Sequence, residues 1–543
     1  MYTKIWLNKF KPFASRQTGR LAPLTIIYGP NSAGKSSIIQ SILLQKQSLY
    51  SSTSIHRSAG PINSSGPGFN FGSIRALVHR QRPGQSFAIG LEYEIPNSEE
   101  PFFGPNTSPY GSESVVRAGV EFKVKVPRTG DPNAHWIEEI AYSFTGDSGT
   151  EGTLEFRQGT RKPSDYTGPN DAEELTLIPT GSYSLKGTSI GLVIDILLNS
   201  APDLVFSAAD EEDYSSVEQA IARAFSVGEF SYSNPFGDYE LLPTSFNIRS
   251  KALAWRELHP NTLYMGQPLE FWQELERAVN VNLHLQSAIF EAGLNSVIHL
   301  GPLRSPEQRG LRFHYQDTGE TVGSDGGNAS GVFTQSTPDQ QNEINRWFKQ
   351  LKLNYEVQVE NKSDLIIGNL LQLTLKTRNN DPVIRTSSDV GFGFTQILPV
   401  IVQGVVSRSD VICVEQPEIH LHPRLQAELA DFFVDTANKN HNQWIVETHS
   451  ELLVRRLQRR IREGTLAPDQ VSILYVDPIS SQSSRIMELR LDEAGEFIDE
   501  WPEGFFDEGF NEATAPSSKP GEFLEDEILE IPSEENESLG SSR

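Results

Sequence analysis

One glycine-rich segment near the start of the chain constrains its fold more than any other feature. The segment GPNSAGKSS (29–37) follows the apolar run LTIIY (24–28) and precedes a stretch with apolar residues at helical spacing (38–44). It fits the pattern G-x-x-x-x-G-K-[ST] in full, with the strand before it and the helix after it that a phosphate-binding loop requires. A glycine turn with a purely structural role is the alternative, and the two matching flanks disfavour it. The segment therefore predicts a P-loop within an α/β fold.

The residue types of this loop explain how it would hold a nucleoside triphosphate. Glycines let backbone N–H groups turn towards phosphate oxygens, and the following helix adds the positive end of its dipole. Lys35 is expected to reach the β- and γ-phosphate oxygens, and the hydroxyl of Ser36 to hold Mg²⁺. The predicted nucleotide-binding residues are Gly29, Pro30, Asn31, Ser32, Ala33, Gly34, Lys35, Ser36 and Ser37.

The composition narrows the class of protein that carries this loop. The 543 residues include 46 basic and 71 acidic ones, and the formal net charge of -25 argues against a general polyanion-coating protein, although a local basic groove remains compatible with it. A single cysteine rules out an internal disulfide framework. The longest apolar runs (190–198 and 397–402) are far shorter than the roughly 18 residues of a membrane span, and lysines interrupt the apolar N-terminal stretch. We expect a cytoplasmic protein with no signal peptide and no membrane segment.

The negative charge is concentrated near the end of the chain. Residues 507–543 contain eleven acidic and two basic residues, a balance of -9, and they are rich in Glu, Ser and Pro and poor in aromatic residues. Such a segment cannot bury enough apolar surface to order itself, so it predicts a disordered acidic tail. A solvated tail without function is the favoured interpretation, and a partner-binding or self-inhibiting tail is the alternative.

Shifts in sequence pattern divide the chain into five parts. Between 87 and 185, short alternating segments separated by turn residues predict antiparallel strands. Between 189 and 296 the pattern is mainly helical, without the sustained heptads of a coiled-coil arm. We predict the N-terminal part of a P-loop domain (1–95), an antiparallel β-rich portion (96–188), a mainly helical insertion (189–296), the C-terminal part of the P-loop domain (297–507) and the disordered tail (508–543).

Three segments downstream of the P-loop carry residues suited to nucleotide chemistry. The apolar run VICV (411–414) ends at EQPE (415–418), where an acidic residue at a strand tip would contribute to the Mg²⁺ shell. The segment WIVETHS (444–450) ends a predicted strand with His449, which is suited to contact a γ-phosphate. The glycine-rich segment SDVGFGFTQ (388–396) opens an apolar helix. Each is weak by itself, and their order after a strong P-loop makes them informative.

With these segments the chain resembles an ABC-type ATPase of the SMC/OLD-like branch, within the prokaryotic AAA ATPases that end in a WPxGFFD segment. Relatives of this type resemble the ATPase subunits of antiphage systems that pair an ATPase with a nuclease, the Septu type among them. The resemblance covers roughly residues 1–95 and 295–507. The matching segments are FKPF (10–13), PLTIIYGPNSAGKSS (23–37), FGSIRALVH (71–79), LGPLR (300–304), DVGFGFTQILP (389–399), EQPEIHLHPRLQAELA (415–430), ETHSELLVRRLQRRI (447–461) and WPEGFFD (501–507).

The resemblance implies a fold, cofactors and partners. The fold would be an ABC-type P-loop ATPase head of the α/β class, with a mixed sheet flanked by helices and an antiparallel β subdomain. ATP and Mg²⁺ would be the cofactors, and two subunits would form a head-to-head dimer around two ATP molecules, with a separate nuclease subunit as partner. His449 would be the switch histidine. The signature residues, which would contact the nucleotide of the other subunit, are Ser388, Asp389, Gly391, Gly393 and Gln396.

One departure from the ABC pattern concerns the catalytic base. Aligning Pro417 places Glu415 at the metal position and Gln416 where a catalytic glutamate usually stands. Glutamine can orient a water but cannot take its proton, and general-base assistance is typically worth roughly 10²–10⁴-fold. Some GTPases nevertheless orient their water with glutamine, and Glu418 is an alternative base. We expect slow hydrolysis and long-lived ATP-bound dimers, with ATP as a conformational switch or as fuel.

Several other polar groups have competing interpretations. Glu418, His420 and His422 form a candidate metal trio, for which loop packing is favoured over zinc ligation. Arg304 is expected either to reach the nucleotide or a partner or to form a structural ion pair. A predicted helix carries five arginines, which form either a solvated face paired with Glu451 and Glu463 or a contact to the DNA backbone. These arginines are Arg455, Arg456, Arg459, Arg460 and Arg462.

Three functions compete. The favoured one is an ATPase subunit of an antiphage defence complex that regulates a separate nuclease. The alternative is an SMC-like ATPase that acts directly on DNA in repair or chromosome maintenance, and the lack of heptads and the acidic balance weigh against it. A self-contained nuclease with a Toprim domain is disfavoured because about 90 residues follow His449, which is less than the roughly 100 residues typical of a domain.

Overall fold

The computed structural model describes most of the chain up to Glu500. The chain divides into two compact units, Met1–Glu500 and Trp501–Arg543, and all described residues belong to the first. The predicted tail and the WPEGFFD segment lie outside the described residues. The described residues are 1–49, 61–66, 69–94, 115–128, 132–146, 151–161, 178–188, 230–233, 248–250, 269–305, 311–312, 321–364, 368–378, 382–385, 390 and 392–500.

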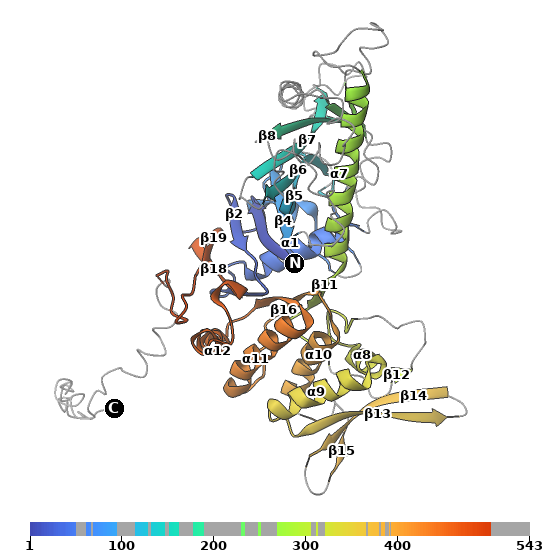
Figure 1. Cartoon of the computed structure of the whole chain (residues 1–543), viewed down its shortest axis with the longest axis vertical. Coiled ribbons are helices and arrows are strands. Elements are labelled where there is room, and N and C mark those ends of the chain that lie inside the picture. The colour runs from blue at the N-terminus through green and yellow to red at the C-terminus, as the bar shows by residue number, and fades with distance from the viewer. Residues whose placement is uncertain are drawn as a thin grey trace, which may run out of the picture. The chain divides into compact units, whose positions relative to one another are not determined.

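A mixed sheet carries the P-loop (Figure 1). In the described part of the chain it has six strands in the order β11-β16-β17-β3-β18-β19, parallel except for the antiparallel edge strand β19. Every residue of β3, β16 and β17 is buried, as expected for parallel strands covered on both faces. The strands are β3 (Leu24–Tyr28), β11 (Val297–Leu300), β16 (Val411–Glu415), β17 (Gln443–Glu447), β18 (Val471–Ser480) and β19 (Ser483–Glu488).

Helices with local start signals flank this sheet. The N-cap of α11 is His422, whose Nδ1 accepts a hydrogen bond from the backbone N of Arg424, and the N-cap of α12 is Ser450, whose hydroxyl accepts one from Leu453 N. Helix α11 packs against α10 and α12. The α/β class with a mixed sheet flanked by helices is thus confirmed. The helices are α1 (Lys35–Leu49), α10 (Phe392–Val406), α11 (Pro423–Asn440) and α12 (Glu451–Arg462).

An antiparallel sheet joins the first residues of the chain to the β-rich portion. Among the described residues its order is β10-β9-β8-β7-β6-β5-β4-β1-β2, so the predicted parts 1–95 and 96–188 share one sheet. Alternating apolar residues on these strands form part of the main core. The strands are β1 (Tyr2–Asn8), β2 (Gln17–Arg20), β4 (Ser86–Glu94), β5 (Val115–Lys125), β6 (Trp136–Gly146), β7 (Glu151–Arg161), β8 (Ile178–Thr188), β9 (Phe230–Ser233) and β10 (Ile248–Ser250).

The described residues of the predicted helical insertion include one long helix and two short strands. Helix α7 (Leu269–Asn295) runs alongside the antiparallel sheet (Figure 1) and contacts α1 and β5. The Tyr93 hydroxyl donates a hydrogen bond to Gln286 Oε1 at 2.6 Å, and the Phe122 and Phe290 rings pack with centroids 5.9 Å apart. Strands β9 and β10 have four and three residues, too few for a clear alternating pattern, and pairing within the sheet stabilises them.

A smaller antiparallel sheet and two helices lie between β11 and α10 in the sequence. In this region the structure describes β14 between β12 and β13, with β15 also paired to β14, and helix α9 packs against β13 and α10. Helix α9 begins with a capping box of Thr337 and Gln340. The elements are β12 (Leu311–Arg312), β13 (Tyr355–Asp364), β14 (Gly368–Thr377), β15 (Ile384–Arg385), α8 (Ala329–Gln335) and α9 (Pro338–Gln350); a short helix α2 (Ile74–Leu77) precedes β4.

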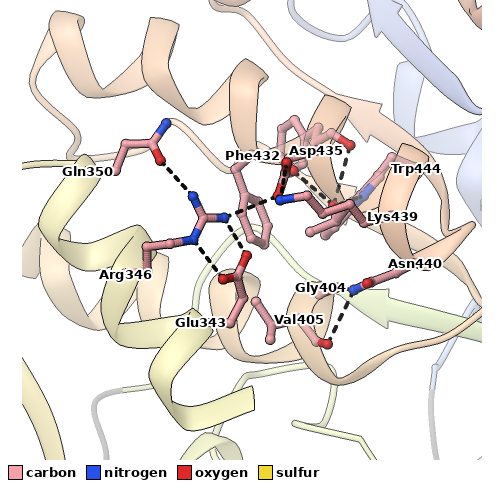
Figure 2. Close-up of polar contacts among 12 residues, drawn as sticks. Glu343, Arg346, Gln350, Gly404, Val405, Phe432, Asp435, Lys439, Asn440 and Trp444 are labelled. Atoms are coloured by element: carbon pink, nitrogen blue, oxygen red, sulfur yellow. Dashed lines mark hydrogen bonds and ion pairs between the residues drawn. The ribbon is translucent and has the colours of Figure 1, made fainter. Parts of the chain in front are cut away.

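A polar and aromatic cluster fastens α9 to α11 (Figure 2). Arg346 of α9 bonds to Glu343 and lies 3.4 Å from Asp435 Oδ2 of α11. The next residue of α9, Trp347, packs edge-on against Phe432 of α11 with ring centroids 5.2 Å apart. The hydrogen bond from Arg346 lowers the pKa of Glu343.

Among the described residues, no helix is both long and apolar enough to cross a membrane.

Candidate nucleotide-binding site

The loop 29–34 between β3 and α1 has a backbone that demands glycine at two positions. Gly29 and Gly34 have φ angles of 141° and 106°. A Cβ atom at Gly29 would lie 2.5 Å from the carbonyl oxygen of Val476, and one at Gly34 would clash with Pro12 of the FKPF segment. Neighbouring segments therefore enclose the loop tightly, which holds its backbone in the turned conformation that a P-loop needs.

Lys35 and Ser36, the first residues of α1, bond respectively to the loop itself and to the neighbouring strand β17. Lys35 Nζ donates hydrogen bonds to the carbonyl oxygens of Gly29 at 3.0 Å and Pro30 at 2.8 Å, so its side chain folds back over the loop. Burial lowers the pKa of Lys35, and the charges of Glu447 and Glu418 oppose this change. Ser36 Oγ donates a hydrogen bond to Glu447 Oε1 at 3.1 Å.

Two parallel strands bring carboxylates to the same sheet edge as the loop. Glu415 ends β16, Glu447 ends β17, and the two are direct register partners, while Glu447 is also the partner of Ile27 in β3. Glu418 follows β16 closely, and all three carboxylates, which we call the carboxylate cluster, are buried. Burial and the neighbouring Glu415 raise the pKa of Glu447 to about 7.

The Ser36 hydroxyl and two of these carboxylates, Glu415 and Glu447, offer oxygen donors that suit a divalent cation. The Oε2 atoms of Glu418 and Glu447 are buried and have no hydrogen-bond partner among the described residues, and unpaired buried carboxylate oxygens are costly. A hydroxyl with carboxylates is the oxygen donor set that Mg²⁺ prefers. Ser36, Glu415 and Glu447 are thus the residues that would hold the ion. Glu447 was not a sequence-predicted site residue, although its strand QWIVE repeats the pattern of VICVE, an apolar run that ends in glutamate.

A residue of strand β11 and a residue of the loop after β17 contact the carboxylate cluster. His299 on β11 places its Nε2 2.8 Å from Glu415 Oε1. The Glu418 carboxylate accepts a hydrogen bond from the backbone N of His449 at 2.7 Å, which ties the loop after β16 to the loop after β17. Burial lowers the pKa of His449, and the nearby Lys35 acts in the same direction.

Gln416 lies at the end of β16, directly beside this cluster. It has a left-handed backbone with φ of 44°, and its backbone N donates a hydrogen bond to the carbonyl oxygen of Glu447 at 2.7 Å. The fold therefore places Gln416 and Glu418 near the P-loop, and His449 with them. These are the residues that the sequence assigned to water positioning, an alternative base and phosphate contact.

The described part of the predicted signature segment (388–396) makes its contacts within the chain. A Cβ atom at Gly393 would lie 2.7 Å from the His420 carbonyl oxygen, so α10 approaches the loop after β16 closely. Gln396 is fully buried and bonds to the backbone of Arg304 through both ends of its amide. A contact of Gln396 with another subunit stays a prediction and would require these bonds to break. Ser388, Asp389 and Gly391 lie outside the described residues.

The remaining polar candidates have structural partners. His422 caps α11, Glu418 is bonded to His449 N, and no group of three His, Cys, Asp or Glu side chains that could hold a metal occurs among the described residues. The arginines of α12 each have an acidic partner. The pairs are Arg455 with Glu451, Arg456 and Arg460 with Asp431, Arg459 with Glu463 and Arg462 with Glu496.

Two protein families match parts of the second half of the chain. Residues 327–454 match the AAA ATPase domain family, and residues 466–514 match a protein family of unknown function, DUF3696. No curated protein sequence matches the chain.

Solved structures of SMC head domains also match. The SMC head domain from Thermotoga maritima is 11% identical, with 90% of this chain and 99% of that chain covered and a TM-score of 0.33. The Smc head domain with an extended coiled coil bound to the C-terminal domain of ScpA, derived from Pyrococcus furiosus, is 10% identical, with 90% and 96% covered and a TM-score of 0.36. A Smc head domain with a coiled coil and joint, derived from Pyrococcus yayanosii, is 11% identical, with 91% and 98% covered and a TM-score of 0.35.

The residues that match the AAA ATPase domain family include strand ends at the same sheet edge as the P-loop. The matched residues 327–454 include α10, β16, α11, β17 and His449, whereas the P-loop precedes them in the sequence. Pairing of β17 with β3 brings the P-loop beside the ends of β16 and β17. The chain therefore combines a P-loop with a segment that is similar to AAA ATPase domains.

Proposed function

We propose that the chain binds ATP with Mg²⁺ at this site and hydrolyses it slowly. The observation that carries the proposal is the hydrogen bond from Ser36 Oγ to Glu447, beside Glu415 and at the sheet edge where the P-loop begins. Lys35 binds the phosphates, and Ser36, Glu415 and Glu447 hold the ion. Bound Mg²⁺ would supply charge neutralisation on the phosphate oxygens. The buried, unpaired oxygens of Glu447 and Glu418 support a site that is completed by a ligand.

The groups available near the attacking water favour slow turnover. The side chain of Gln416 is a neutral amide that cannot act as a base, so it orients the water without general-base assistance. Glu418 is the alternative base, but one of its oxygens already accepts a hydrogen bond from His449 N. His449 contacts the γ-phosphate in this proposal. ATP-bound states are then long-lived, which suits a conformational switch.

We further propose that two subunits sandwich ATP and that the dimer regulates a separate nuclease subunit in antiphage defence. The support for this part is the sequence resemblance, in particular the combination of P-loop, signature segment, EQPE and WPEGFFD. Direct action on DNA has less support, because the arginines of α12 that would contact phosphates are ion-paired with acidic residues.

Nucleotide binding tests the ATPase proposal. Isothermal titration of the whole chain with ATP and Mg²⁺ should give saturable binding that Lys35→Ala abolishes. Lys439→Ala is the matched control, since Lys439 is an exposed lysine on α11 paired with Asp435, and it should leave binding unchanged. Equal binding by the chain and by Lys35→Ala would refute the assignment of the site.

Purification from the native host with companions retained tests the defence proposal. The expected result is a stable complex in which a second subunit cleaves nucleic acid and loses regulation when Lys35 is replaced by Ala. Repeated isolation of this chain by itself, with DNA tethering of its own, would favour the SMC-like alternative.

A further inference from the structure

Arg304 is a buried arginine that joins two parts of the proposed site. It lies in the loop after β11 and is 2% exposed. Its guanidinium donates hydrogen bonds to the carbonyl oxygen of Glu415 at 2.7 Å, through Nη2, and to that of Gln396 at 3.4 Å, through Nη1. One side chain therefore bonds both to the end of β16, where the carboxylate cluster begins, and to the first turns of α10.

The Gln396 side chain returns the contact. Its Oε1 accepts a hydrogen bond from the backbone N of Arg304 at 3.1 Å, and its Nε2 donates one to the carbonyl oxygen of Arg304 at 2.7 Å. Close packing reinforces the link, since a Cβ atom at Gly326 would lie 2.5 Å from Pro399 of α10 and one at Gly393 would meet the loop after β16. The start of α10 cannot shift along the loop after β16 without breaking these contacts.

Burying the charge of Arg304 costs more free energy than a purely structural link between these segments requires. Its Nε is buried and has no hydrogen-bond partner among the described residues. Burial lowers the pKa of Arg304 to about 10, and the charges of Glu418 and Glu415 oppose this change. A buried charge with an unpaired donor costs free energy that an apolar side chain of similar size avoids. Its bond to the carbonyl oxygen of Glu415 places the guanidinium at the end of β16, so the position of this charge is more informative than its contribution to stability.

We propose that Arg304 is a positioning residue that couples the end of β16 to helix α10, so that the predicted signature segment responds to the nucleotide in its own subunit. The inference rests on the proposed ATPase function. Filling of the P-loop site acts on Glu415, and Arg304 passes the resulting change to the helix that follows the signature segment. In a dimer this link makes the two ATP sites interdependent, because each signature segment would face the other subunit's nucleotide.

The test separates nucleotide binding from turnover in Arg304→Lys. Lysine keeps the charge, but its single ammonium cannot bridge both carbonyl oxygens as the planar guanidinium does. We expect the dissociation constant for ATP to stay within about threefold, while kcat falls by about 10- to 100-fold, the size expected for misplaced reacting groups. The Hill coefficient for ATP should fall to about one. A dissociation constant and kcat that change together, in step with a lower melting temperature, would mean a merely structural role and overturn the proposal.

Hydrogen exchange of the unaltered chain gives a second measurement that needs no variant. ATP with Mg²⁺ should slow exchange at 411–416 and at 392–400 together, and protection confined to 411–416 would overturn the coupling. Gln396→Leu removes the two side-chain bonds to the Arg304 backbone but not the guanidinium bonds, so it should weaken the joint protection without abolishing it. If the unaltered chain binds no ATP, the proposed function fails and the coupling fails with it. If ATP binds and turns over but Arg304→Lys changes nothing, only the coupling fails.

Discussion

Glu447 connects the P-loop to the neighbouring strand end through one side chain. Its Oε1 accepts the hydrogen bond from Ser36, and its Oε2 is buried without a partner among the described residues. Glu415 is its direct register partner on β16 and is held in turn by His299. The ion would therefore lie between a hydroxyl from α1 and carboxylates from two strands.

Glu447→Gln should weaken Mg²⁺-dependent ATP binding and leave Mg²⁺-independent binding nearly unchanged. Loss of one charged ligand or its close support typically costs about 10- to 100-fold in metal affinity. Titrations with ATP at high and low Mg²⁺ measure the difference. Glu496→Gln is the matched control. Glu496 is an exposed glutamate that follows α12 in the sequence, and its side chain pairs with Arg462. Equal effects of the two substitutions would argue against an ion at Glu447.

Gln416→Glu should raise ATP turnover if this position faces the attacking water. The new carboxylate supplies a general base, which is typically worth roughly 10²–10⁴-fold. Steady-state release of phosphate by the purified chain measures the change. Unchanged turnover in Gln416→Glu, together with loss of turnover in Lys35→Ala, would show that Pro417 has been aligned wrongly with the ABC pattern.

At the scale of elements, one aromatic contact is central to the packing of α9 against α11. Trp347 of α9 is 2% exposed and packs edge-on against Phe432 of α11, with the Arg346 guanidinium 5.0 Å from its ring centroid. Figure 2 draws the ion pairs of Arg346 with Glu343 and Asp435, in which the Arg346 side chain is 45% exposed. Apolar burial should therefore contribute more than these ion pairs to the position of α9.

Trp347→Ala should destabilise this part of the chain strongly and Arg346→Ala only weakly. Removing a buried tryptophan costs about 3–5 kcal/mol in free energy of unfolding. Loss of an exposed ion pair costs less than about 1 kcal/mol. Urea denaturation followed by far-ultraviolet circular dichroism compares the two variants, and similar losses in both would contradict the ranking.

At the scale of the whole molecule, self-association bears on the proposed switch. Two large apolar side chains lie exposed in segments that carry site residues: Leu303, 71% exposed, directly precedes Arg304, and Leu452, 36% exposed, closely follows His449. Burial of such side chains against a second subunit would stabilise an ATP-bound dimer. The net charge of -25 opposes association and makes it sensitive to salt.

ATP with Mg²⁺ should convert the chain to a species of twice its mass. Because hydrolysis is slow, the lifetime of this dimer should exceed the time that one ATP turnover takes in an ABC-type ATPase with a catalytic glutamate. Light scattering coupled to size-exclusion chromatography measures the mass with ATP, with ADP and without nucleotide. Lys35→Ala should remain at the lower mass under all three conditions. A mass that does not respond to ATP in either protein would contradict the sandwich dimer.

The P-loop and the acidic strand tip could be predicted from the sequence because they are local patterns. The P-loop is marked by glycines at fixed spacing before Lys35 and Ser36 and by an apolar run before those glycines, and the strand tip is marked by an apolar run before Glu415. Each pattern lies within a few consecutive residues. The α/β class follows from the same alternation of buried strands and helices. Chain order alone also placed His449 after the acidic segment.

Only the tertiary structure decided which of these groups meet. Strand order brings Glu447 to Ser36 across 411 residues of sequence, sets His299 behind Glu415 and buries Arg304 between β16 and α10. It also pairs the α12 arginines with acidic residues from α11 and beyond. The physical reason is that local patterns specify elements, whereas a side chain's role depends on remote partners, their distance and the loss of water around them.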